Sequence, residues 1–218
     1  MEKLEKMADF FAKRVKMYDE HMLNDVEGCK EGYIKMAEFV PDDCKRLLDL
    51  GCGTGLELDA IFRKIPDLSV TGIDLCEEML LKLKEKFRDK NISLICGDYF
   101  TADFSKGFDC AVSFQTMHHF THEKKTALYK KIFDALTDEG VYIECDYMVE
   151  TEEEEKHWFG ESKRLRELQG IGEDEFFHYD TPCTIDNQIK MLKKAGFSDV
   201  EKVMRIENTT MLVARKVK

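Results

Sequence analysis

From Arg46 onward, short apolar runs alternate with stretches of helical periodicity. The runs are RLLDLGC, SVTGIDL, ISLICGD, FDCAVSF and GVYIECDY, and helix-like stretches follow at 55–65, 76–89, 122–137 and 151–169. Strands that are apolar on both faces and alternate with helices indicate a parallel sheet covered on both sides. The pattern therefore predicts an α/β protein with a doubly wound sheet and helices on both faces.

The two ends of the chain depart from this alternation. Residues 3–18 carry apolar side chains near helical spacing, which predicts an amphipathic helix lying over an apolar surface. A second helix-like stretch, 184–195, ends at Gly196 and is followed by the apolar runs VEKVMRIEN and TTMLVARKV with almost nothing between them. Because strands joined so closely pair antiparallel, we expect a mostly parallel seven-stranded sheet with a reversed last strand.

Length and charge limit the classes of function. A chain of 218 residues suits one domain with additions. Its 33 Lys and Arg against 44 Asp and Glu give a net charge of -11, so nucleic acid is a disfavoured partner. We expect a cytoplasmic protein, because no apolar run resembles a signal peptide or a membrane span. The 8 cysteines lack zinc-finger spacing and are expected to pack as reduced thiols.

The segment LLDLGCGTGLEL, 47–58, places three glycines at alternate positions directly after the first strand. Glycine permits positive φ and removes the Cβ that would hold a ligand away, and the next helix presents free N–H groups. The spacing G-x-G-x-G differs from the dinucleotide fingerprint, whose third glycine position is Leu56 here. Asp49, two residues before the first glycine, suits a positively charged ligand better than a pyrophosphate.

Two further acids end the next two strands. Asp74 ends VTGIDL, where a carboxylate can accept both hydroxyls of an adenosine ribose. Asp98 ends ISLICGD, where it could accept a hydrogen bond from an adenine amine. Each acid alone could also be a helix N-cap. Together with the glycines, three strand ends indicate one adenosine-like ligand.

These motifs resemble a known family. LLDLGCGTG, GIDLCEEML, GDYF and FDCAVSFQTMHHF are similar, in order and spacing over about 45–147, to motifs of class I S-adenosylmethionine-dependent methyltransferases. The resemblance implies that Gly51, Cys52 and Gly53 line the methionine part of the cofactor. It also implies that Asp49 lies near the amino group and Gln115 near the methionine and sulfonium.

For the adenosine part of the cofactor, the resemblance implies five contacts. Asp74 would hold the ribose, Leu75 and Met79 would border the adenine, and Asp98 with Tyr99 would read the adenine edge. The cofactor would be S-adenosylmethionine, with S-adenosylhomocysteine as the product.

The resemblance also implies a lid. We expect one methyltransferase domain over 1–218, with an N-terminal helical lid at about 1–40 and an inserted helical segment at about 151–182. Tyr18 is the lid residue expected to close over the cofactor's methyl group, although a plain amphipathic helix fits that segment equally well.

The pair of histidines before Phe120 invites a metal or general-base interpretation. Side chains of adjacent residues are expected to diverge, and no carboxylate or cysteine is close in sequence, so we expect a helix start lining the cofactor pocket and no metal. If the acceptor must lose a proton, His119, Tyr18 and Asp146 are the candidate catalytic residues, in no fixed order. Asp146, at the end of the fifth strand, is expected to face the crevice.

The sequence thus predicts transfer of a methyl group to an O, N or S atom of a small-molecule acceptor by direct in-line displacement. One alternative is a non-catalytic S-adenosylmethionine-binding module. Another is a methyltransferase or cofactor-modifying enzyme linked to RNA modification, which the acidic total disfavours. We expect a monomer or homodimer with no membrane partner.

Overall fold

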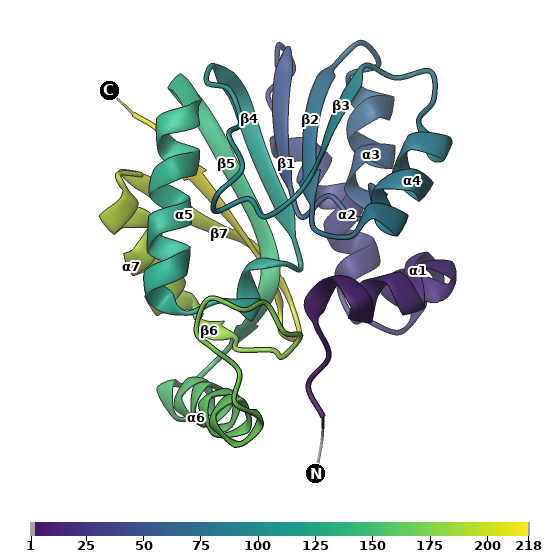
Figure 1. Ribbon diagram of the computed structural model, residues 1–218. Helices are drawn as coiled ribbons and strands as arrows, with labels where there is room; N and C mark the ends of the chain where they lie inside the picture. The colour runs from purple at the N-terminus through teal and green to yellow at the C-terminus, as the bar shows by residue number, and fades with distance from the viewer. Residues whose placement is uncertain (1–2, 218) are drawn as a thin grey trace.

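The computed structural model describes residues 3–217, and a single mixed sheet forms its centre (Figure 1). Residues 1–2 and 218, which the expected domain includes, lie outside the described part. The strand order is β3-β2-β1-β4-β5-β8-β7, with the short β6 paired to the end of β5. The strands are β1 (Arg46–Leu50), β2 (Ser69–Asp74), β3 (Ile92–Cys96), β4 (Phe108–Phe114), β5 (Leu136–Val149), β6 (Cys183–Thr184), β7 (Asp199–Ile206) and β8 (Thr209–Arg215).

The strand directions confirm the fold predicted from the sequence. β1 pairs in parallel with β2 and with β4, and β5 continues the parallel set beside β4. β8 is antiparallel to both β5 and β7, so the last strand of the chain is the reversed one. It lies between β5 and β7 rather than at the edge of the sheet. The carboxyl ends of β1, β2 and β4 consequently meet on one side of the molecule.

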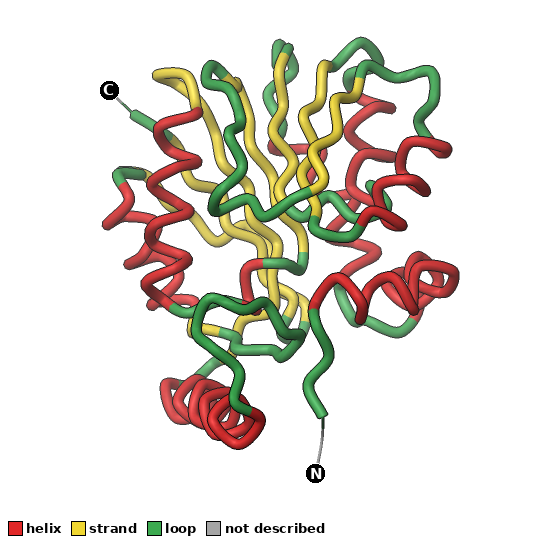
Figure 2. The backbone as a smooth tube through the Cα atoms, viewed as in Figure 1, coloured by secondary structure: helices red, strands yellow, loops and turns green. Residues whose placement is uncertain are grey.

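Helices cover both faces of this sheet (Figure 2). They are α1 (Met7–Asn24), α2 (Cys29–Phe39), α3 (Leu56–Lys64), α4 (Glu77–Lys86), the 3-10 turn η1 (Met117–His119), α5 (His122–Ala135), α6 (Glu152–Gln169) and α7 (Ile185–Ala195). Leu47 belongs to the core under α2 and α3, whereas Leu48 belongs to the core under α5 and α7. Successive side chains of a strand point to opposite faces, which explains why the strands are apolar throughout.

The N-terminal region contains a helix that periodicity did not predict. α1 extends further than expected, and α2 follows it with Gly32 on its buried face. A Cβ at Gly32 would approach the Phe114 ring to 2.9 Å, so the helix packs unusually close to the sheet. Tyr33 and Met36 share that face. Gly32, Ala37 and the short length of the helix nevertheless leave its helical signal in the sequence weak.

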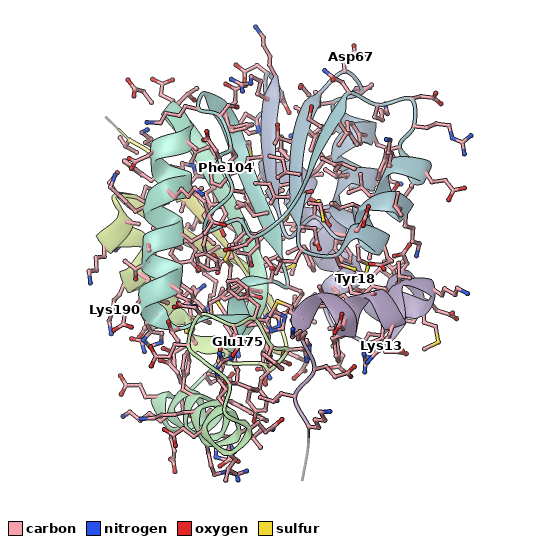
Figure 3. All side chains as sticks on the ribbon, viewed as in Figure 1. Lys13, Tyr18, Asp67, Phe104, Glu175 and Lys190 are labelled. Atoms are coloured by element: carbon pink, nitrogen blue, oxygen red, sulfur yellow. The ribbon has the colours of Figure 1, made fainter. Side chains whose placement is uncertain are left out.

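α1 lies across the carboxyl end of the sheet, beside the glycine segment (Figure 1). Asp19 fixes it there, because it accepts a hydrogen bond from Thr54 Oγ1 at 2.7 Å and forms an ion pair with Lys82 at 2.9 Å. Figure 3 shows Tyr18 on the side of α1 that faces the sheet and Lys13 on the outer side. Among the described residues, no helix combines the length and apolar character that crossing a bilayer requires.

The insertion between β5 and β6 begins with α6, which projects away from the sheet (Figure 1). Its N-cap is Thr151, whose hydroxyl accepts a hydrogen bond from the Glu154 amide at 3.2 Å. The following segment returns to the N-terminus. There the Met7 amide donates to the Phe176 carbonyl at 3.0 Å and the His178 amide to the Glu5 carbonyl at 2.9 Å. The insertion and the N-terminal segment thus close the same side of the molecule.

Candidate functional site

The three glycines after β1 all have positive φ, as expected, but they serve two purposes. Their φ angles are +70° at Gly51, +44° at Gly53 and +71° at Gly55. A Cβ at Gly51 would lie 2.6 Å from Thr116 Oγ1, and one at Gly55 would lie 3.0 Å from the Phe87 ring, so the protein itself fills those positions. A Cβ at Gly53 would meet no atom closer than 4.0 Å. Only Gly53 therefore leaves room for a ligand.

A pair of buried acids lies at the end of β1 and the start of α3. Asp49 is fully buried and Glu57 nearly so, and neither oxygen of Asp49 has a hydrogen-bond partner among the described residues. Burial, reinforced by the nearby Glu57, raises the pKa of Asp49 well above its usual value. Burial also raises the pKa of Glu57 to about 7. Buried carboxylates without partners are costly, and a cationic ligand would relieve that cost.

Asp74 and Asp98 lie at the ends of β2 and β3 and are held by local backbone. Asp74 accepts hydrogen bonds from the amides of Gly53 at 2.9 Å and Cys76 at 2.8 Å, which ties the second strand to the glycine segment. Asp98 accepts from the Phe100 amide at 2.8 Å. Each carboxylate oxygen keeps further lone-pair capacity for a ligand.

The other residues that the resemblance assigned to the cofactor surround this loop. Met79 is buried and Leu75 half-buried beside Asp74. The Tyr99 hydroxyl lies 2.9 Å from Thr116 Oγ1, and Thr116 also contacts Gly51. Cys52 is buried, and its Sγ packs over Gly72 of β2.

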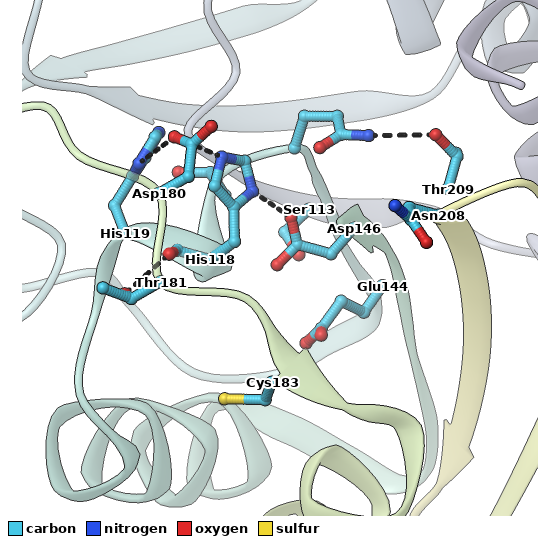
Figure 4. Close-up of polar contacts among 12 residues, drawn as sticks. Ser113, His118, His119, Glu144, Asp146, Asp180, Thr181, Cys183, Asn208 and Thr209 are labelled. Carbon is cyan, nitrogen blue, oxygen red and sulfur yellow. Dashed lines mark hydrogen bonds and ion pairs between the residues drawn. The ribbon is translucent and has the colours of Figure 1, made fainter. Parts of the chain in front are cut away.

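Gln115 follows β4 in a strained backbone conformation. Its φ is +49°, a value that residues other than glycine rarely adopt and that often marks functional sites. Its amide hydrogen-bonds to the Cys145 carbonyl at 2.8 Å, and its side-chain nitrogen donates to Thr209 Oγ1 at 3.3 Å (Figure 4). The side chain is thereby held at the wall of a large cavity.

That cavity has a volume of about 910 Å³, which suits a small-molecule ligand. α1, η1, the end of β5 and the segment before β6 surround it. Of the predicted catalytic residues, Tyr18 and His119 line it. Asp146 does not, which corrects the expectation that it faces the crevice. Its place on the wall is taken by Tyr147, because adjacent strand residues point in opposite directions.

Asp146 instead supports His118. Its side chain is buried, and its Oδ1 lies 2.6 Å from His118 Nδ1 (Figure 4). Burial lowers the pKa of His118, but the carboxylates of Asp146 and Asp180 outweigh that effect and raise it to about 10. Asp146 is therefore a positioning residue for an imidazole that lines the cavity.

The two adjacent histidines converge, so the expectation that their side chains diverge was wrong. Their ring centroids are 4.1 Å apart, and Asp180 Oδ1 lies 3.4 Å from both His118 Nε2 and His119 Nδ1. The two side chains leave the backbone in different directions, but Nε2 of His118 and Nδ1 of His119 both come near Asp180 Oδ1. Burial, followed by the charge of His118, lowers the pKa of His119 well below its usual value.

Comparisons with known proteins agree with the cofactor end of this site. The model of a methyltransferase domain family matches residues 47–140, from β1 into β5. The chain carries a class I S-adenosylmethionine-dependent methyltransferase domain. S-adenosylmethionine is its cofactor. The domain's residues fit that ligand where the structure tests them, because the unpartnered oxygens of Asp49 suit a cation and Gly53 leaves space at the loop.

One relative of similar sequence aligns with nearly the whole chain, including the segments before and after the methyltransferase domain match. The carboxy-S-adenosyl-L-methionine synthase of Nautilia profundicola is 26% identical over 98% of this chain and 96% of the relative.

Solved structures share the fold at lower identity. The chain covers 62% of a putative O-methyltransferase from Nostoc punctiforme, with 20% identity, a TM-score of 0.73 and 97% of this chain aligned. It covers 57% of human N-acetylserotonin methyltransferase in complex with S-adenosylmethionine, with 17% identity, a TM-score of 0.67 and again 97% of this chain aligned.

Two residues of the methyltransferase site could not be singled out from the sequence. Thr116 looked like an ordinary strand end, yet it connects Gly51 with Tyr99. Asp180 lies in the stretch FFHYD, which matches no motif of the glycine loop or of the strand ends. The order His-Tyr-Asp at 178–180 places a histidine near an acid, but its position in the chain gives no indication of contact with His118 and His119.

Proposed function

We propose that this enzyme transfers the methyl group of S-adenosylmethionine to an oxygen, nitrogen or sulfur atom of a small molecule held in the 910 Å³ cavity. The observation that supports the proposal is the position of this cavity. It is bounded by Tyr18, whose ring lies near the glycine loop, and by Gln115, which follows the strand beside β1. When bound, the cofactor supplies a methyl group made electrophilic by a sulfonium.

In this proposal the cofactor is held by the residues that the family resemblance indicated. The carboxylate of Asp49 attracts the ammonium group, and Asp74 accepts the ribose hydroxyls with the lone pairs that its backbone contacts leave free. Asp98 and Tyr99 border the adenine edge. The Tyr18 ring covers the open side of Gly53 and excludes water.

Of the predicted catalytic candidates, His119 lines the cavity and has the imidazole that is kept neutral. Its lowered pKa makes it a weak base, so its role is to accept a hydrogen bond and orient the acceptor. Burial raises the pKa of Tyr18 far above its usual value, so this phenol stays protonated and can orient an acceptor rather than deprotonate it. Asp146 acts only through His118.

A second candidate function is synthesis of carboxy-S-adenosylmethionine, because relatives with that name align over nearly the whole chain. A carboxyl group beside the methyl carbon would require an unpaired cation nearby. The guanidinium on the described cavity wall, that of Arg14, lies 3.1 Å from Glu5 Oε1 and is already paired. Because Arg14 is paired with Glu5, it is not free to bind a carboxylate beside the methyl carbon, which favours methyl transfer over carboxylation.

Mass spectrometry separates the two functions. The enzyme is incubated with S-adenosylmethionine bearing a labelled methyl group, together with phenols, thiols and amines sized for the cavity. We expect S-adenosylhomocysteine and one acceptor that carries the labelled methyl group. A parallel incubation also supplies small carboxylic acids as possible carboxyl donors, and a cofactor that gains the mass of a carboxyl group there would establish the second function. Cofactor binding without turnover of any acceptor would contradict the proposal.

A further inference from the structure

Three side chains from two distant segments converge at the cavity wall. His118 and His119 belong to η1, and Asp180 comes from the segment between α6 and β6 (Figure 4). The nearest ring nitrogen of each histidine lies 3.4 Å from Asp180 Oδ1. One donor atom from each residue lies within 4.8 Å of the other two.

These separations fit a shared metal ion better than direct hydrogen bonds. Hydrogen bonds between nitrogen and oxygen are about 2.7–3.2 Å long. Asp180 Oδ1 is shielded from solvent and has no hydrogen-bond partner among the described residues. Two ligands of a tetrahedral zinc ion, each at about 2.0–2.2 Å, stand about 3.3–3.5 Å apart. The observed separations of 3.4 Å match that value.

The surroundings of His118 have the form of an outer coordination shell. Asp146 Oδ1 lies 2.6 Å from His118 Nδ1, which orients the opposite nitrogen, Nε2, toward Asp180. A carboxylate bound to the far nitrogen of a ligating imidazole is the usual support of a zinc-binding histidine. Asp146 is almost completely buried, so this support is rigid.

A second cluster of similar composition lacks these features. His122, Glu155 and Cys183 also lie close together. Among the described residues the His122 Nε2 atom lacks a hydrogen bond, like the carboxylate oxygen of the first cluster, but Glu155 and Cys183 already hold hydrogen bonds within the protein. Glu155 accepts hydrogen bonds from Asn187 Nδ2 at 3.0 Å and forms an ion pair with His122 at 2.8 Å. Cys183 Sγ accepts from Lys125 Nζ at 3.1 Å. This cluster joins α5, α6 and α7, and its members do not line the cavity.

We propose that His118, His119 and Asp180 bind a divalent transition-metal ion, with Zn²⁺ as the ion that this donor set suits. Two imidazoles and one carboxylate leave a coordination position open, as in catalytic zinc sites. All three residues line the cavity, so the open position faces it. His178, whose Nε2 lies 3.8 Å from Asp180 Oδ1, borders the same side.

The role of the ion rests on the proposed methyl transfer. A hydroxyl or thiol that occupies the open position would have its pKa lowered by the ion and release its proton to solvent. The oxygen or sulfur would keep the lone pair that methylation requires. The site would then select acceptors that bind metals over purely apolar ones.

Two existing contacts would change on binding. The ion would replace the proton between His118 Nε2 and Asp180 Oδ1, and one contact of His119 would be lost. His119 Nδ1 lies 3.4 Å from the Tyr179 carbonyl oxygen, which can only accept a hydrogen bond. A coordinating nitrogen carries no proton, so this long contact would not persist. The loss is small compared with the bond to a metal.

Metal titration of the full-length protein tests the site without any acceptor. The protein is stripped with a chelator, and Co²⁺ is added while visible absorption is recorded, followed by competition with Zn²⁺. We expect one equivalent of Co²⁺ to produce the absorption bands of tetrahedral coordination, and Zn²⁺ to abolish them. His119→Gln and Asp180→Asn should each weaken binding at least 100-fold, with thermal melting confirming that the variants fold.

Two control variants locate the ion. His157→Gln, on the exposed side of α6, should bind as the unchanged protein does. His122→Gln should also bind normally, and loss of the ion in that variant would place it in the second cluster and overturn the proposal. An absence of tetrahedral bands, or full binding by Asp180→Asn, would show that the three residues form only an ion-paired cluster. Methyl transfer by the metal-free protein would remove the role of the ion but leave the proposed function intact.

Discussion

Two pairs of buried acids, Asp49 with Glu57 and Glu144 with Asp146, lie toward the carboxyl side of the sheet and differ in their partners. Neither oxygen of Asp49 has a partner among the described residues. By contrast, Glu144 accepts from Tyr142 Oη at 2.9 Å and from Gln188, and Asp146 contacts His118. Burial raises the pKa of both Glu57 and Glu144 to about 7.

Burial and pKa shift alone therefore do not distinguish a ligand site from a structural network. Burial of the first pair lowers the folding stability of the cofactor-free protein, and a bound cationic ligand would offset that cost. The second pair is mostly compensated by the protein itself, although Asp146 Oδ2 also lacks a partner among the described residues. Because both oxygens of Asp49 lack one, the first pair is the stronger candidate for the binding site.

Neutralising one acid of each pair tests this difference with the largest expected effect. Asp49→Asn keeps the shape and removes the charge. We expect the dissociation constant for S-adenosylmethionine to rise about 100-fold, equivalent to about 2.7 kcal/mol, because the ammonium loses its buried counter-charge. Thermal stability of the cofactor-free protein should stay the same or increase. Calorimetric titration and thermal melting measure the two quantities.

Glu144→Gln is the matched control. Replacing this carboxylate leaves the Tyr142 hydroxyl and the Gln188 amide with a mismatched partner. We expect a loss of about 2 kcal/mol in unfolding free energy and near-normal cofactor affinity. If Asp49→Asn destabilised the fold while Glu144→Gln abolished binding, the assignment of the two pairs would have to be reversed.

The glycines of the loop allow the same comparison on a smaller scale. Gly53→Ala places a Cβ where no atom lies closer than 4.0 Å, so the strain is limited to about 1 kcal/mol from its positive φ. We expect cofactor affinity to fall about tenfold. Gly51→Ala forces a Cβ to 2.6 Å from Thr116 Oγ1 and should mainly reduce thermal stability. Unchanged cofactor affinity in Gly53→Ala would show that no ligand uses this space.

The sequence predicted those parts of the molecule that adjacent residues determine. Strands β1, β2, β4 and β5 were visible because both of their faces are mostly buried, and the loop was visible because three glycines stand together. α2 was not visible in the periodicity, because it is short and its buried face includes Gly32 and Ala37. The two-residue β6 is too short to produce any pattern.

The acceptor side of the site depends on contacts between distant segments, which the sequence does not encode in any spacing. Asp180 reaches the two histidines because the insertion returns to the N-terminal segment through the His178–Glu5 hydrogen bond. Asp146 was predicted by position but with the wrong orientation, because the expectation did not allow for His118 covering it. The residues proposed for the cofactor cluster in motifs, whereas those proposed for the acceptor are brought together only by the fold.

The smallest expected effect is the pH dependence of cofactor binding. Below about pH 7 the raised pKa of Glu57 keeps a proton on the Asp49–Glu57 pair in the free protein. A bound cation favours the ionised pair, so binding releases that proton and becomes tighter as pH rises. We expect affinity to increase several-fold between about pH 6 and 7.5. Titrations in buffers of different ionisation enthalpy would count the released protons.

Glu57→Gln should flatten this pH dependence, because Glu57 no longer shares a proton with Asp49 or raises its pKa through its charge. Glu144→Gln should leave it unchanged, although burial raises the pKa of Glu144 in the free protein as well. The difference follows from linkage, since a group contributes to the pH dependence of binding only if the ligand changes its protonation. An affinity that stayed constant or fell with pH would mean that the cofactor's charge does not reach the pair at the end of β1.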